Sequence, residues 1–84
     1  MNSKQRRTLD AVFADPASGT IEWAALEALL VAAGCSIREG SGSSVSFRFG
    51  EKVEHFHRPH PQKEAKRYQV RAARAFLIRI GITP

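Results

Sequence analysis

The sequence has a single cysteine and no long hydrophobic run. Cys35 has no partner for an intramolecular disulfide, which agrees with a reducing compartment. No apolar stretch approaches the ~20 residues that a membrane-spanning helix requires. The basic start of the chain also lacks the hydrophobic segment of a secretory signal, because Asp10 and Asp15 interrupt its apolar residues. We therefore expect a cytoplasmic protein without a membrane anchor, with Cys35 as a small buried apolar residue.

Acidic residues are few relative to basic ones. Eight Asp and Glu stand against thirteen Lys and Arg, which gives a formal net charge of +5 and a pI near 10.2. This balance favours an anionic partner, and nucleic acid is the first candidate because each neutralised phosphate releases counterions. Many small proteins are basic without such a partner, so the positions of the charges must decide. The chain also lacks a P-loop, a GxGxxG motif, paired metal-binding cysteines and an HExxH motif.

The length of 84 residues allows one hydrophobic core but not two. We predict a single domain over residues 1–84, with an additional N-terminal helix and turn over residues 1–19 and a core over residues 20–84. In the additional part, apolar spacing predicts a helix from about residue 4 to residue 14 with Ser3 as its N-cap. No internal repeat or interdomain linker is present.

Two further helices belong to the predicted core. The first follows Thr20 as N-cap and ends at Gly34, and Trp23 takes part in its core-facing stripe. The second runs from about residue 68 to residue 80. Basic residues gather along one edge of this last helix and in the segment before it, namely Lys63, Lys66, Arg67, Arg71 and Arg74.

Three strands are expected between these helices, over residues 35–39, 44–49 and 52–58. Alternating apolar residues from Val45 onward and a two-residue turn at Gly50-Glu51 predict a hairpin in which Ser44 lies opposite His57. A three-residue loop would shift the pairing by one residue and turn the strand's histidines toward the core. We prefer the two-residue turn because it directs Phe56 inward, although it also places Glu54 on the inner face.

The predicted order is α-α-β-β-β-α, an α+β fold with helices on one face of a three-stranded antiparallel sheet. Apart from the first helix, this is the order of a double-stranded-RNA-binding domain, a class that reads RNA by shape and phosphate contacts. The order of elements alone supports the fold far better than it supports the function.

The histidines, His55, His57 and His60, all fall within six residues of one another. We predict no metal site, because His55 and His57 have no cysteine nearby and Glu54 points to the other face. An imidazole can instead take the proton of a ribose 2′-hydroxyl, while Lys or Arg stabilises the charged phosphorane. The alternative for His60 is a turn residue between two prolines, and the alternative for the basic edge is a solvated face.

Over residues 23–82 the sequence resembles the HicA-like toxins of type II toxin–antitoxin systems, which are small mRNA interferases. The resemblance rests on four features, namely a helix ending in Gly34, Gly42-Ser43 opening a strand that reaches Phe47, the segment PHPQKE at residues 59–64, and a closing helix that ends in LIRIGI at residues 77–82. The resemblance implies a double-stranded-RNA-binding-like fold, cofactor-independent cleavage of mRNA and inhibition by a HicB-like antitoxin that covers the active face.

One residue departs from the family pattern. In that family a Gly-Ser-His triplet opens the second strand and its histidine is catalytic, whereas the third matching position here is Ser44. A serine hydroxyl cannot act as a general base near neutral pH. We therefore expect either a non-catalytic RNA-binding or protein-interaction relative, or replacement of the missing group by His57, with its imidazole ~5 Å away across the strands.

The resulting site prediction has two parts. The candidate catalytic residues are His57, Ser44 and His60. The candidate RNA-binding residues are Lys63, Lys66, Arg67, Arg71, Arg74, Arg48 and Arg58.

Overall fold

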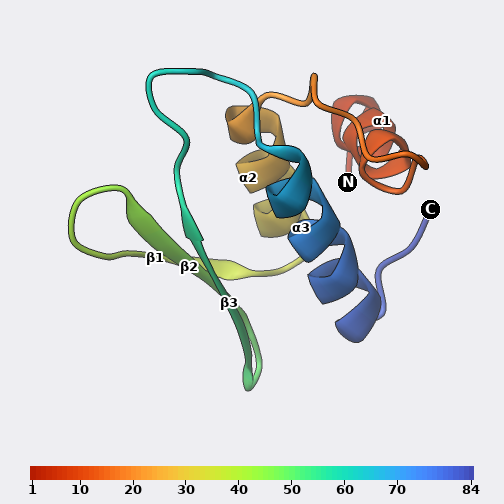
Figure 1. Ribbon diagram of the computed structural model, residues 1–84. Helices are drawn as coiled ribbons and strands as arrows, with labels where there is room; N and C mark the ends of the chain where they lie inside the picture. Colours follow the sequence, from red (N-terminus) through yellow and green to blue (C-terminus); the bar gives the residue numbers. More distant parts are fainter.

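The two later helices lie on one face of a three-stranded antiparallel sheet, and the first helix packs against these two helices (Figure 1). This computed structural model describes all 84 residues. Its elements are α1 (Ser3–Val12), α2 (Trp23–Ala32), β1 (Ser36–Glu39), β2 (Ser44–Phe49), β3 (Lys52–His57) and α3 (Arg67–Arg79). The predicted α+β fold and its α-α-β-β-β-α order are confirmed. None of the helices has the length and apolar character to cross a membrane.

The predicted cap of α1 is wrong by one residue. Asn2, not Ser3, is the N-cap: its side-chain oxygen accepts a hydrogen bond from the Gln5 N–H at 2.9 Å, and the Gln5 side chain accepts one from the Asn2 N–H at 3.0 Å. This reciprocal pair is a capping box and satisfies two backbone donors at the helix start. Ser3 is the first residue inside the helix.

The predicted cap of α2 is also wrong, for a tertiary reason. The Thr20 hydroxyl pairs with Ser18 at 2.9 Å and caps nothing. The start of α2 instead pairs with the distant segment that precedes α3: the Trp23 N–H donates to the Lys63 carbonyl at 2.8 Å, and the Ala65 N–H donates to the Ile21 carbonyl at 2.8 Å. A backbone segment far along the chain therefore takes the place of a capping side chain.

The core lies between the helices and the inner face of the sheet. Trp23 of α2 contacts Phe47 of β2 and Phe56 of β3, with ring centroids 6.4 and 5.3 Å away, and the two phenylalanine rings are 5.9 Å apart. These separations are those of favourable edge and tilted aromatic contacts. Trp23 is therefore a core residue, as predicted, and attaches α2 to the two central strands.

The predicted hairpin register is confirmed. Ser44 pairs with His57, and Val45 pairs with Phe56. Gly50 has φ +62°, and no residue other than glycine has positive φ, which matches a type II′ turn at Gly50-Glu51. Both histidines of β3 consequently face away from the helices.

Glu54, the carboxylate that this register turns toward the inner face, has an ion-pair partner. Glu54 lies on the inner face of β3, and its Oε1 is 3.4 Å from Nη1 of Arg79 at the end of α3. The Arg79 guanidinium also lies 5.4 Å from the Phe76 ring centroid. The pair stands at the rim of the core, where both side chains keep partial contact with solvent.

Candidate nucleic-acid interface

The outer face of the sheet carries serine and histidine side chains from neighbouring strands. The Arg58 N–H donates to the Ser43 carbonyl at 2.9 Å, so these two residues form a hydrogen-bonded pair. Pairs alternate along an antiparallel ladder, so Ser44 and His57 form a non-hydrogen-bonded pair, the kind in which side chains approach most closely. The register therefore places the exposed His57 opposite Ser44 on the outer face, which is the pairing that the sequence predicted.

A second pair of the same kind lies two residues further along the strands. The Ser46 hydroxyl and Nδ1 of His55 are 2.7 Å apart and share a hydrogen bond. The His57 side chain, by contrast, forms no hydrogen bond with another side chain. His57 is therefore the histidine of this face whose ring nitrogens are both open to a ligand.

Gly40 provides space beside Ser44. A Cβ atom built on Gly40 would lie 2.9 Å from Ser44 Cβ and 3.0 Å from its Oγ, which is too close for an ordinary side chain. The absence of a side chain at Gly40 therefore leaves room on the outer face for the group at position 44.

The segment that follows β3 is anchored by an ion-pair network on the helix side of the sheet. Arg58 Nε and Nη2 donate to Glu27 of α2 at 2.7 and 3.0 Å, and Nη1 and Nη2 donate to Glu39 of β1 at 2.6 and 2.9 Å. The Trp23 indole also donates to Glu27. Hydrogen bonding from Arg58 lowers the pKa of Glu39, and the two carboxylates raise the pKa of Arg58. The Arg58 guanidinium is thus occupied within the protein.

A buried amide fixes the end of β3 against the start of α3. Gln69 is only 2% exposed. Its Nε2 donates to the His57 carbonyl at 2.8 Å, and its Oε1 accepts from the Lys66 N–H at 2.9 Å. Gln69 was not predicted as a functional residue; its signal in the sequence is a polar residue on the otherwise apolar buried stripe of α3. It positions the backbone of His57 relative to the basic helix.

Part of the predicted basic edge is directed toward the N-terminal segment. Arg74 Nε donates to the Val12 carbonyl at 2.9 Å, and its Nη2 donates to the Ala14 carbonyl at 2.6 Å. Arg67 Nε donates to the Ala17 carbonyl at 3.2 Å. These two arginines hold α1 and the following turn onto α3.

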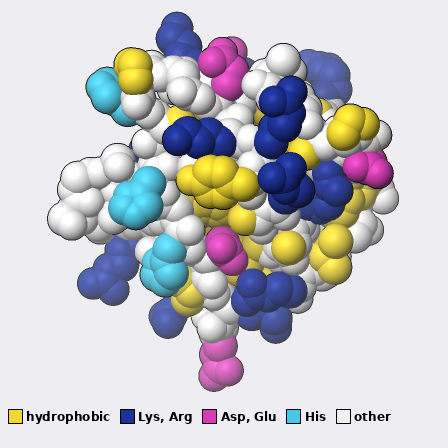
Figure 2. All heavy atoms as spheres, viewed as in Figure 1, with side chains coloured by type: hydrophobic (Ala, Val, Ile, Leu, Met, Phe, Trp, Pro, Cys, Tyr) yellow, Lys and Arg dark blue, Asp and Glu magenta, His cyan; other side chains and the backbone are white.

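The other predicted cationic residues are exposed and form no ion pair within the chain. They are Lys63, Lys66, Arg71 and Arg48. Figure 2 shows Lys and Arg side chains, histidines and an exposed hydrophobic group close together on one face of the molecule. His60 is also exposed, in the segment between Arg58 and Lys63. The face combines imidazoles and exposed positive charges.

Tyr68 adds an aromatic surface that sequence analysis did not single out. It is 58% exposed in the first turn of α3. It directly precedes Gln69, which bonds β3, and it shares a helix edge with Arg79, which pairs with Glu54 of β3. Tyr68 therefore lies on the edge of α3 that faces β3.

The remaining reactive groups offer no separate centre. Burial raises the pKa of the Cys35 thiol, which stays protonated near neutral pH. No cluster of three or more His, Cys, Asp or Glu side chains has the geometry to hold a metal ion. The arrangement supports proton transfer by imidazole and binding of an anionic chain.

Comparison with known proteins yields one match. A family model described as the HicA toxin of bacterial toxin–antitoxin systems matches residues 23–82. The matched segment runs from the first residue of α2 to just beyond α3, and α1 lies outside it. No curated protein and no solved structure matches the chain significantly.

Proposed function

Because the chain belongs to the HicA toxin family of bacterial toxin–antitoxin systems, we propose that it is a toxin that binds and cleaves mRNA in the cytoplasm. A HicB-like antitoxin neutralises it. The family in general implies an antitoxin partner and an RNA target.

One observation carries the catalytic proposal, namely the pairing of Ser44 with His57. In the HicA-like pattern the position of Ser44 holds the catalytic histidine, and serine cannot serve as a base there. The paired position on β3 brings an imidazole to the same part of the outer face. His57 takes over the missing role, and Ser44 contributes a hydroxyl that can hydrogen-bond a phosphate oxygen.

The reaction is an internal transesterification. His57 accepts the proton of a ribose 2′-hydroxyl, the 2′-oxygen attacks the adjacent phosphorus, and the bond from phosphorus to the 5′-oxygen breaks. His60, in its protonated form, donates a proton to that leaving oxygen. The products are a 2′,3′-cyclic phosphate and a 5′-hydroxyl end, so no metal or cofactor enters the balance.

The exposed cations bind the RNA backbone in this proposal. Lys63, Lys66 and Arg71 flank the start of α3, and Arg48 lies on the outer face of β2. Each neutralises a phosphate and stabilises the charge of the phosphorane. Arg58, Arg67 and Arg74 have N–H groups that bond within the protein, so in this proposal they contribute to RNA binding mainly through their positive charge.

The test is cleavage of a defined RNA oligonucleotide by purified protein. Wild-type protein is expected to cleave it in the presence of EDTA and to leave the 2′-deoxy analogue intact. His57→Ala is expected to lower the rate by about 10²- to 10⁴-fold, the usual contribution of a general base. His55→Ala is the matched control, because His55 lies on the same strand face but bonds Ser46. Full activity of His57→Ala would refute the catalytic proposal.

A second candidate function is a non-catalytic RNA-binding relative. The serine at position 44 favours it, since the family's base is absent there. In that case the wild-type protein binds the oligonucleotide without cleaving it. Ser44→His is then expected to create activity, because Gly40 leaves room beside position 44.

A further inference from the structure

The solvent face of α2 is apolar. Its buried stripe consists of Trp23 and three leucines, while a second stripe faces outward at the spacing i, i+4, i+7 and i+8. The residues of this outer stripe are Ala24, Ala28, Val31 and Ala32. Val31 is 49% exposed, and Glu27, the one charged residue of α2, is bound to Arg58. A helix that is apolar on all sides is normally buried, so the outer stripe is suited to a partner.

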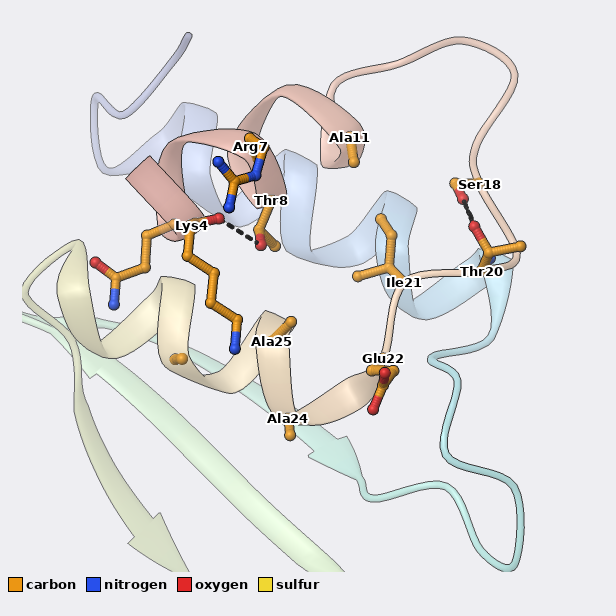
Figure 3. Close-up of a pocket in the computed structure, with 12 residues that line it drawn as sticks. Lys4, Arg7, Thr8, Ala11, Ser18, Thr20, Ile21, Glu22, Ala24 and Ala25 are labelled. Carbon is orange, nitrogen blue, oxygen red and sulfur yellow. Dashed lines mark hydrogen bonds between the residues drawn. The ribbon is translucent and has the colours of Figure 1, made fainter. Parts of the chain in front are cut away.

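A groove between α1 and α2 extends this apolar surface (Figure 3). Its volume is about 610 Å³, and α2 contributes Ala24, Ala25 and Ala28 to it. A second hollow of about 630 Å³ shares Ala24 and Ala28 and continues to Val31 and Ile37. Because α1 lies outside the matched family segment, one wall of the groove belongs to the additional part of this chain.

The α1 wall carries positive charge without internal compensation. Lys4 and Arg7 line the groove, and Figure 3 shows the Lys4 side chain extending toward α2. Neither residue forms an ion pair within the chain, and the first turn of α1 has no acidic residue. Cations near a helix N-terminus interact unfavourably with the helix dipole. Carboxylates of a partner placed beside Lys4 and Arg7 would reduce this repulsion. Glu22, at the start of α2, also lines the groove and would repel carboxylates of a partner. The acidic groups of a partner therefore belong at the Lys4–Arg7 end of the groove.

We propose that this surface docks an acidic amphipathic helix of the antitoxin, at a site separate from the histidine face that the antitoxin is expected to cover. The identity of the partner rests on the proposed function. Small side chains along the stripe permit close approach of a second helix, with axes about 8 Å apart. The alanine floor offers no donors for phosphates, which favours a protein helix over RNA. Apolar residues of the partner cover the outer stripe, and its carboxylates meet Lys4 and Arg7.

The test is binding of a purified HicB-like antitoxin to the full-length chain by calorimetry. Val31→Glu is expected to raise Kd at least tenfold, because it places a charge in an apolar contact. Lys4→Glu combined with Arg7→Glu is expected to raise Kd and to weaken its salt dependence. Ile78→Glu is the matched control, since Ile78 is 54% exposed on α3, and is expected to leave Kd unchanged.

Several outcomes would overturn the inference. The first is an unchanged Kd for a Val31→Glu variant that keeps its native circular dichroism. The second is wild-type protein that does not bind the antitoxin. The third is a wild-type dimer that Val31→Glu dissociates, because a second copy of the chain would then cover the stripe. Charge-reversal variants that weaken only RNA binding would likewise contradict it. RNA cleavage by the same preparations separates the two proposals. If the wild-type protein neither cleaves nor binds RNA, the proposed function is wrong. If it cleaves RNA and Val31→Glu leaves the Kd for the antitoxin unchanged, only the docking surface is wrong.

Discussion

Replacing Gln69 by leucine removes the amide that joins β3 to the start of α3. Two hydrogen bonds are lost, to the His57 carbonyl and from the Lys66 N–H, while the side chain remains of similar size. Each such bond contributes about 0.5–1.5 kcal/mol net, and a buried group left without a partner costs about 1–3 kcal/mol. Water can reach part of the freed groups, because His57 and Lys66 are exposed.

The expected loss of unfolding free energy for Gln69→Leu is therefore about 2–3 kcal/mol. This is a large share of the total for a chain of this length, about 4–13 kcal/mol. The melting temperature is expected to fall by about 10–20 °C. Thermal and urea unfolding followed by circular dichroism measure both quantities.

The matched control is Gln62→Leu, an exposed glutamine in the same region that forms no side-chain hydrogen bond. Its melting temperature is expected to stay within about 2 °C of wild type. If Gln69→Leu melts as the control does, the amide does not join the two elements, and the reasoning about this contact is wrong.

Glu39, Arg74 and Tyr68 can each be tested by one substitution. Hydrogen bonding from Arg58 lowers the pKa of Glu39. The stabilisation by Glu39 is therefore fully present above its ordinary pKa of 4.5 and is lost as the pH falls through the lowered pKa. The difference in melting temperature between wild type and Glu39→Gln should accordingly shrink on acidification. Arg74→Ala should speed amide hydrogen exchange in α1 while α3 stays protected, because the end of α1 and the turn after it each lose one anchoring bond. Tyr68→Ala should weaken binding of an uncleavable RNA by about 5- to 150-fold if a base stacks there, and Tyr68→Phe should not.

The hairpin could be predicted because its determinants are local. A glycine at the first turn position and the inward preference of Phe56 together select one register, and the register determines which way His57 faces. The helix caps could be predicted less well. Asn2 and Ser3 are both good caps, so the choice between them depended on Gln5, while Thr20 lost its role to a backbone segment about forty residues away.

The free and bound cations could not be distinguished from the sequence. Arg58, Arg67 and Arg74 look like Lys63 and its neighbours in composition and spacing, yet their N–H groups find partners in other elements. Such partners lie 19 to 62 residues away along the chain. Only the folded chain brings these donors and acceptors together.

The sequence by itself therefore determined the order of elements, the strand register and the family, because periodicity, turn residues and short motifs are local properties. The tertiary structure alone decided which arginines are occupied, that Gln69 holds the end of β3, and that α2 keeps an uncovered apolar stripe. Each of these depends on which segments meet in space, since burial and hydrogen bonding are completed by residues distant in the chain.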